Sequence, residues 1–297
     1  MTDVELFSEG VVAYGLGERF NRSRLTADQW AKGYAEWDGL AKHLFSDAKL
    51  YVPRLPNIHF DFIYNPIPNA SAFKYKGRFF IGITTGLRYM LDLILLRMLA
   101  HPRLFLTIGN PSEENPNQEP FPFYTTDAQV MAKSGIKAQR PINIDRLAYS
   151  HELFLKAAFF ILGHELAHIS RGHLDYLESK SDQALISESS IVPRWDLPAD
   201  ENLLESQLLE FDADRRSMLS SIETAKRIHE TSSFVHPVPS INARRTVEHL
   251  LFDWSVAMNT FLVHQALQWV KNSVRMGRNC GDSLPCETSM SSHNCWR

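Results

Sequence analysis

The stretch AAFFILGHELAHIS, residues 157–170, carries the strongest structural signal in this chain. It lies within residues 153–177, which contain no proline. Residues at steps of three and four, the spacing of one helical face, form a stripe: Phe154, Ala157, Ile161, His164 and His168. The stripe predicts a core helix whose buried side carries two imidazoles.

The segment His164-Glu165-Leu166-Ala167-His168 has the pattern H-E-x-x-H. Four residues advance a helix by about 400°, so both imidazoles stand on nearly one face and can bind one tetrahedral ion. Glu165 lies about 100° round from His164, where its carboxylate can reach a water on the metal. The pattern predicts zinc ligands at His164 and His168 and a general base at Glu165. The alternative is a buried helix with two hydrogen-bonded histidines and no metal.

Composition narrows the class of protein. The chain has 297 residues, 44% of them hydrophobic, which is enough for a substantial core. A formal net charge of -3 gives no basic field, so no nucleic-acid partner is expected. The apolar segments 87–100 and 153–162 are interrupted by charged residues, and we expect core helices with no membrane span.

The two ends of the chain bear on its location. Residues 1–10 carry three acids and lack a basic region followed by an apolar stretch, so we expect a cytoplasmic protein. All three cysteines lie at position 280 or later, which leaves the main body without disulfides. A second metal site is an alternative, with four candidate ligands: Cys280, Cys286, His293 and Cys295. Their spacing matches no zinc module, so a flexible tail over 278–297 is favoured.

Hydrophobic periodicity predicts an α+β fold that is mainly helical. We expect a helical extension over 1–57, a metal-binding domain over 58–277 and the tail described above. Within the domain, 58–64 and 79–84 are strand candidates flanking a turn, and together they suggest a small antiparallel unit. The remaining predicted elements are helices at 26–47 and 87–100, a loop at 111–122, a helix from about 200 and a long helix over about 243–276.

A catalytic zinc site usually has three protein ligands and an open position. The metzincin pattern requires Gly at 171 and His at 174, but the chain has Arg171 and Leu174 there. His173 lies five residues past His168, which turns it roughly 140° away on a continuous helix. It can reach the same zinc only if the helix breaks at Gly172.

Glu210 is the stronger candidate for the third ligand. Glu210 and Asp214 share one helix face at i and i+4, so one acid can bind zinc while the other accepts a hydrogen bond from a ligand histidine. Ala213 and Ser217 are small and let this helix approach the zinc helix closely. The alternative is a solvated acidic face in which Asp212 pairs along its own helix.

These residues resemble the gluzincin peptidases that join H-E-x-x-H to a downstream E-x-x-x-D, particularly the CAAX prenyl protease and HtpX-like family. HELAHISRGH (164–173) resembles that family's zinc helix, including an extra histidine, and EFDADR (210–215) resembles its ligand helix. The resemblance implies a gluzincin-type core with a small antiparallel sheet or hairpin at the cleft edge. Unlike those peptidases, the chain shows no clear transmembrane helices.

A third segment supports the resemblance. NASAF (69–73), followed by ITTGL (83–87), resembles the family's N-A-x-A segment, strand and T-T-G-L. The resemblance implies that Asn69, Ala70 and Phe73 belong to a strand at the cleft edge that pairs with extended substrate. The alternative is an ordinary hairpin that leads into a core helix.

The order of elements also resembles, more loosely, that of Lit-type phage-exclusion peptidases, which act on host translation machinery. His236-Pro237 resembles an H-P element whose histidine lies near the zinc cleft, which implies a catalytic role for His236. The arginine expected six residues later is Asn242 in this chain. The alternative is a solvated loop histidine.

Together these features lead us to expect a zinc endopeptidase with one Zn²⁺ per chain and a protein or peptide substrate. Its activator, if one exists, is not identified by the sequence. The resemblances imply a role in protein quality control or phage exclusion. The alternatives are a zinc-stabilised regulatory or binding module without turnover, and a zinc hydrolase acting on a non-peptide substrate.

Overall fold

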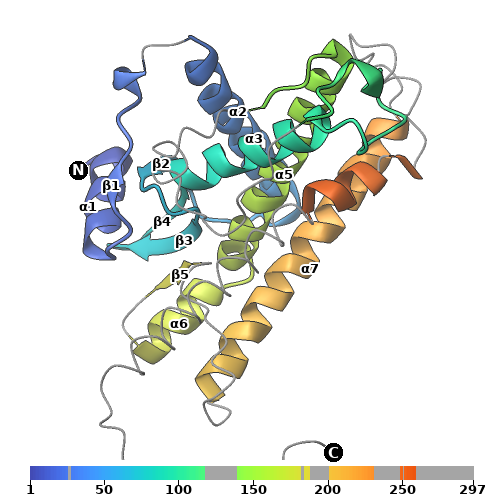
Figure 1. Cartoon of the computed structure of the whole chain (residues 1–297). Helices are drawn as coiled ribbons and strands as arrows, with labels where there is room; N and C mark the ends of the chain where they lie inside the picture. Colours follow the sequence, from blue (N-terminus) through green and yellow to red (C-terminus); the bar gives the residue numbers. More distant parts are fainter. Residues whose placement is uncertain are drawn as a thin grey trace, which may run out of the picture.

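The computed structural model of the chain describes residues 1–25, 28–117, 139–181, 184–187, 201–230, 248–249 and 251–258. They form a mainly helical α+β fold with one five-stranded sheet (Figure 1), so the expected fold class is confirmed at this level. The helices are α1 (Asp3–Ala13), α2 (Asp28–Tyr51), α3 (Thr85–Ala100), α5 (Ile144–Ser170), α6 (His173–Ser181) and α7 (Glu201–Glu230). The strands are β1 (Glu18–Arg19), β2 (Ile58–Tyr64), β3 (Ala70–Tyr75), β4 (Arg78–Thr84) and β5 (Leu185–Ser187). Short 3₁₀ turns occupy Arg22–Arg24 and Pro111–Glu113.

The sheet is mixed, which corrects the expected antiparallel unit. Its strand order is β1-β2-β4-β3-β5, and β2 runs parallel to β4 while the other pairs are antiparallel. The hairpin forms instead between β3 and β4, across Lys76 and Gly77, whose φ values are 48° and 74°. Two positive φ values in a two-residue loop are typical of a type I′ turn, which matches the twist of the strands that it joins. Alternation of apolar residues indicates a strand but not its direction. The sequence therefore did not distinguish parallel from antiparallel pairing of β2 with β4.

Helices cover both faces of the sheet (Figure 1). On one face, α1 places Phe7 against Ile63, Phe73 and Phe80. On the other face, the main core joins the sheet to α2, α3 and α5. Residues 1–57, expected as a helical extension, therefore supply α1, strand β1 and α2 to the same sheet and core.

The central helix α5 is buried along most of its length, as its sequence stripe predicts. Asn143 caps its start by accepting hydrogen bonds from the backbone N–H groups of Asp145 and Arg146. It ends at Ser170 with Arg171 as its C-cap residue, and the φ of 76° at Gly172 is the left-handed conformation that stops helices. Among the described helices, α5 alone is long and apolar enough to cross a membrane, and 89% of that apolar window is buried inside the protein.

The described residues cover only part of two other predicted elements. Within the expected long helix at 243–276, residues 248–249 and 251–258 are helical. Within the expected loop at 111–122, the described residues end at 117 and include one 3₁₀ turn. The tail over 278–297, with its cysteines, lies outside the described residues.

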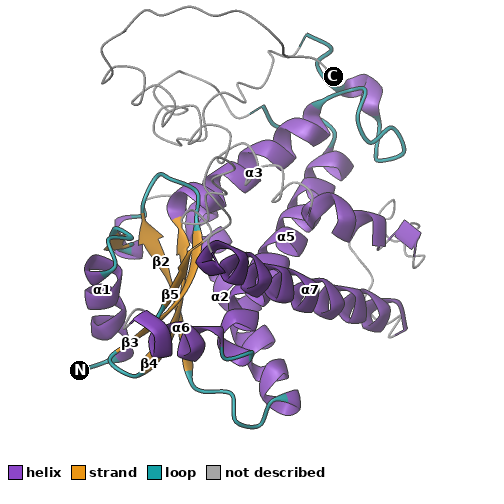
Figure 2. Cartoon of the chain, turned by 90° about the horizontal axis from the view of Figure 1, so that it is seen from below, coloured by secondary structure: helices purple, strands orange, loops and turns teal. Residues whose placement is uncertain are grey.

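Helix α7 lies along α5 (Figures 1 and 2), and the two approach closely at Gly163. A Cβ atom built on Gly163 would stand 2.8 Å from Ser217 Oγ, which itself donates a 2.6 Å hydrogen bond to the carbonyl oxygen of Phe160. Ala213, Ser217 and Ser221 are buried on the same side of α7. The small side chains that the sequence analysis noted do allow this close contact.

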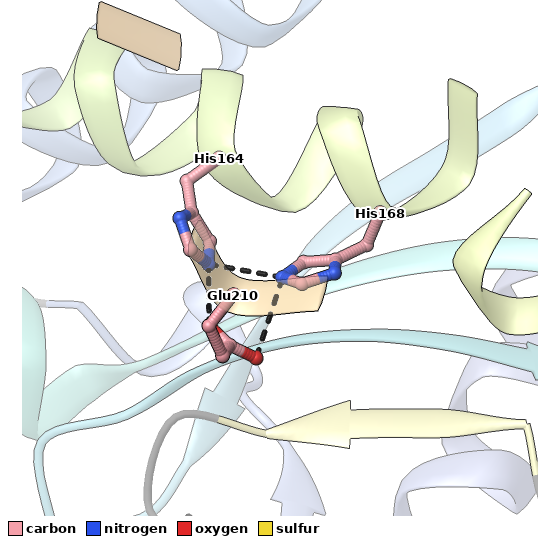
Figure 3. A group of neighbouring side chains, drawn as sticks. All are labelled: His164, His168 and Glu210. Carbon is pink, nitrogen blue, oxygen red and sulfur yellow. Dashed lines mark hydrogen bonds and ion pairs between the residues drawn. The ribbon is translucent and has the colours of Figure 1, made fainter. Parts of the chain in front are cut away.

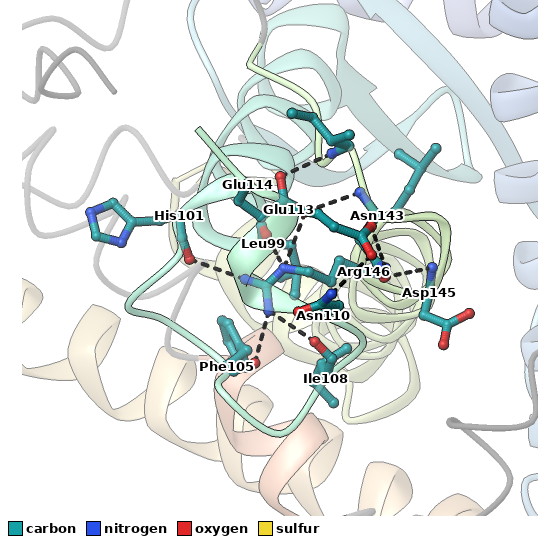
Figure 4. A network of polar contacts seen from close by, with 12 residues as sticks. Leu99, His101, Phe105, Ile108, Asn110, Glu113, Glu114, Asn143, Asp145 and Arg146 are labelled. Atoms are coloured by element: carbon teal, nitrogen blue, oxygen red, sulfur yellow. Dashed lines mark hydrogen bonds and ion pairs between the residues drawn. The ribbon is translucent and has the colours of Figure 1, made fainter. Parts of the chain in front are cut away.

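Arg146 fastens the start of α5 to the chain that follows α3 (Figure 4). Its side chain is fully buried and lies 3.4 Å from Glu114. Its five N–H groups donate, at 2.7 to 3.0 Å, to the backbone carbonyl oxygens of Leu99, His101, Leu104, Phe105 and Ile108. Every donor of the guanidinium is therefore used, which makes Arg146 a structural residue.

We predict that Gly163→Ala destabilises the protein. Alanine favours a helix over glycine by about 1 kcal/mol, but overpacking a close contact costs about 1–3 kcal/mol, and the short Ser217 side chain cannot move far. Urea unfolding should show lower stability than wild type, and adding Ser217→Ala should recover part of the loss. Gly39→Ala is the matched control, because Gly39 lies in α2 with no atom within 4 Å of an added Cβ, and it should stabilise. Equal gains from Gly163→Ala and Gly39→Ala would refute the close contact.

We predict that Arg146→Met lowers the free energy of unfolding by about 3–5 kcal/mol. The substitution keeps much of the volume but leaves the backbone carbonyl oxygens without their donor and the buried Glu114 carboxylate without its neighbouring positive charge. Arg103→Met is the control, because Arg103 is exposed and its loss should change stability by no more than about 0.5 kcal/mol. Chemical denaturation of both variants measures the difference, and similar values for the two would contradict the anchoring role.

Candidate metal centre

Helix α5 carries His164 and His168 one turn apart on its buried side. Both side chains are almost completely inaccessible to solvent, and their rings meet edge to face with centroids 4.7 Å apart. The two Nε2 atoms are 3.0 Å apart. The helix therefore aims both Nε2 atoms at one point, as the H-E-x-x-H spacing predicts.

Helix α7 supplies the third group. Figure 3 shows the Glu210 carboxylate turned toward both imidazoles. Glu210 Oε2 lies 3.1 Å from His164 Nε2, and Glu210 Oε1 lies 3.6 Å from His168 Nε2. Burial raises the pKa of Glu210, but its contacts with the two histidines outweigh burial and lower that pKa to about 2. The carboxylate is therefore ionised at neutral pH.

The three groups fit a small tetrahedral cation. Among the described residues, His164, His168 and Glu210 form one group whose candidate ligand atoms lie within 4.8 Å of one another. Ligands at zinc's usual bond lengths stand about 3.3 Å apart along a tetrahedral edge, close to the contacts seen between these side chains. Burial lowers the pKa of His168 to about 4 despite the nearby Glu210, so its imidazole is neutral and can offer a lone pair.

Glu165 follows His164 directly and is completely buried. Its side chain leaves α5 about 100° round from that of His164. It is not part of the three-residue ligand group. The general base that the sequence analysis predicts at Glu165 thus lies in the core, one residue along α5 from His164.

Asp214 contacts the outer nitrogen of His164, where the sequence analysis places it. Asp214 Oδ1 lies 2.9 Å from His164 Nδ1. A carboxylate at that nitrogen holds the imidazole proton on Nδ1 and leaves Nε2 as the lone-pair donor. The tautomer that Asp214 selects is therefore the one that suits metal binding at Nε2.

His173 also reaches the histidine pair, but from outside. The chain reverses at Gly172, and His173 begins α6 with its Nδ1 atom 3.0 Å from Nδ1 of His168. It therefore contacts the outer nitrogen of a ligand histidine and not the three inner atoms. Asp212, for which the sequence analysis considered only a pairing along its own helix, accepts hydrogen bonds from Arg171 and His173 on the facing side. The sequence signals for this arrangement were Gly172, where the helix can break, and the extra histidine of the resemblance.

The expected substrate-edge residues lie on or next to β3. Ala70 and Phe73 belong to β3, which pairs with β4 on one side and with β5 on the other over Ser71–Phe73. In the described part of the sheet, β5 and not β3 is the outer strand, because Leu185–Ser187 pair with β3. Asn69 precedes β3, and its backbone N–H donates to Thr84 Oγ1.

His236, which the sequence analysis assigns a catalytic role, lies outside the described residues. Comparisons of the chain with protein-family models, with curated proteins and with solved structures find no match in any of the three. The candidate centre therefore stands on its own residues and their geometry.

Proposed function

We propose that this chain is a zinc-dependent endopeptidase in which His164, His168 and Glu210 hold one zinc ion. One observation carries the proposal: three donor atoms from two helices converge on a single point, next to the buried Glu165. The resemblance of the same residues to the gluzincin motifs supports it. Proteins or peptides are the proposed substrates.

The number of ligands favours catalysis over a purely structural role. Structural zinc sites normally close all four tetrahedral positions with protein side chains, whereas catalytic sites keep one open. In the described part of the chain, the ligand group has three members. With these three ligands, a fourth tetrahedral position would be available for water or substrate.

Zinc bound here would supply Lewis acidity, polarising a peptide carbonyl and lowering the pKa of a water molecule to about 7. Glu165 would accept a proton from an attacking water as the water oxygen bonds to the peptide carbon. It would then donate the proton to the amide nitrogen as the C–N bond breaks, which yields a carboxylic acid and an amine. Asp214 keeps His164 in its ligand tautomer throughout.

Zinc content tests the ligand assignment. Glu210→Ala should abolish stoichiometric zinc binding, because it removes the anionic ligand. Asp214→Ala should weaken zinc affinity by about 10–100 fold, because it removes only the hydrogen-bond acceptor for His164. Glu205→Ala is the control on the same helix, since Glu205 pairs with Lys180 at the surface, and it should bind zinc as wild type does. Unchanged zinc content in Glu210→Ala, measured by atomic absorption after dialysis, would rule out this ligand.

Glu165→Gln tests the function itself. The amide is nearly isosteric but cannot take the proton, so the variant should retain one zinc and lose about 10²–10⁴ fold in cleavage rate. We would treat bacterial lysate with zinc-loaded wild type or Glu165→Gln and map new protein N-termini by mass spectrometry. Termini that only the wild type produces would support an endopeptidase and identify substrates. Identical termini, with zinc bound to both proteins, would contradict it.

A further inference from the structure

The two candidate ligand histidines are supported differently at their outer nitrogens. His164 meets the carboxylate of Asp214 directly. His168 instead meets a second imidazole, that of His173, with the two Nδ1 atoms 3.0 Å apart. Both rings of this pair are buried, and the rings meet edge to face at 66°. A histidine therefore stands where a carboxylate supports the other ligand.

The hydrogen bonds of this pair allow one consistent assignment of protons. If His168 uses Nε2 toward the metal, its proton is on Nδ1 and is donated to Nδ1 of His173. His173 then carries its own proton on Nε2, which lies 3.2 Å from Asp212 Oδ2 and donates to it. Arg171 Nε donates to the same oxygen at 2.9 Å. Each donor in the series faces an acceptor.

We propose that His173 and Asp212 are positioning residues that act on the metal site through His168. The proposal rests on the proposed function, because it assumes that His168 is a ligand. Asp212 polarises His173, and His173 holds the proton of His168 on Nδ1, which orients the ring and leaves Nε2 free to bind metal. The pair does for His168 what Asp214 does for His164.

The backbone around His173 keeps this contact in place. Gly172 adopts a φ of 76°, which lets the chain reverse between α5 and α6. Helix α6 is then attached to β3 by Lys74, whose Nζ lies 2.8 Å from Asp175 and 2.6 Å from Glu178. His173 is thus held from both sides, and both of its ring nitrogens already have partners, which argues against its serving as a further metal ligand.

Two substitutions at position 173 separate positioning from packing. His173→Leu fills much of the space without an acceptor and should weaken zinc affinity by about 10–100 fold. His173→Asn places an amide oxygen close to the former Nδ1 and should lose less than about 10 fold, because that oxygen can accept the His168 proton. Zinc affinity is measured by competition with a chromophoric chelator, and Co²⁺ spectra report on ligand geometry. Thermal unfolding of the metal-free proteins reports on folding.

Double substitutions test the order of the relay. Asp212→Asn should weaken zinc binding in a wild-type background but have little further effect in His173→Leu, because Asp212 acts through His173. The fold losses of zinc affinity from Asp214→Ala and His173→Leu should instead multiply in the double variant, because Asp214 supports the other histidine. Asp175→Asn is the control: it removes one of the two α6 contacts to Lys74, and because Glu178 still holds α6 to β3, zinc affinity should stay unchanged.

The outcomes distinguish this proposal from the one on which it rests. Wild type that binds neither zinc nor Co²⁺ overturns both proposals. If wild type and His173→Leu bind zinc with equal affinity, the relay is overturned and the proposed metal site is not. Equal loss in His173→Leu and Asp175→Asn, in step with lower stability of the metal-free proteins, overturns the relay in favour of a packing role. Selective loss in His173→Leu with recovery in His173→Asn supports it.

Discussion

The close approach of α7 to α5 at Gly163 and Ser217 is the contact on which the candidate centre depends. Glu210, Asp214 and Ser217 follow one another at steps of four and three, so they lie on one face of α7. Packing Ser217 against the glycine brings the first two residues of that face within hydrogen-bonding distance of the histidines on α5. A larger side chain at position 163 would separate the helices, and a carboxylate reaches only a few ångströms from its backbone. The candidate metal site therefore depends on the distance between the two packed helices.

The second constraint is electrostatic and concerns protons. When His164 and His168 carry their protons on Nδ1 and donate them to Asp214 and His173, their Nε2 atoms have no proton. These Nε2 lone pairs then face each other and the ionised Glu210. Three electron-rich atoms in contact repel one another unless a cation or an added proton lies between them. The outer hydrogen bonds therefore do more than orient the rings. They convert the inner surface of the site into a place that favours positive charge.

The sequence predicted what depends on local geometry and missed what depends on distant pairing. The i, i+4 arithmetic required only a helical backbone to place His164 with His168 and Glu210 with Asp214. That the two helices meet was expected with the help of the resemblance to the gluzincin motifs. The partner of His168 could not be predicted, because it depends on the left-handed turn at Gly172. The parallel pairing of β2 with β4 and the addition of β5 to β3 depend on hydrogen bonds between backbones, which leave no side-chain pattern. Arg146 was missed for the same reason, since its acceptors are backbone carbonyl oxygens.

The energetic cost of the site supports a use for it. Helix α5 is otherwise an apolar core helix, and burying imidazoles and carboxylates within it costs desolvation energy that apolar side chains of similar volume avoid. Replacing buried ionic groups by well-packed apolar residues is often neutral or stabilising by about 1–4 kcal/mol. A fold that needed only stability would therefore gain little from Glu165 in its core or from Glu210 facing two histidines. Under the proposed function, a bound metal would offset the cost for the three ligands, and proton transfer next to the metal would give the buried Glu165, which lies outside that group, a use of its own.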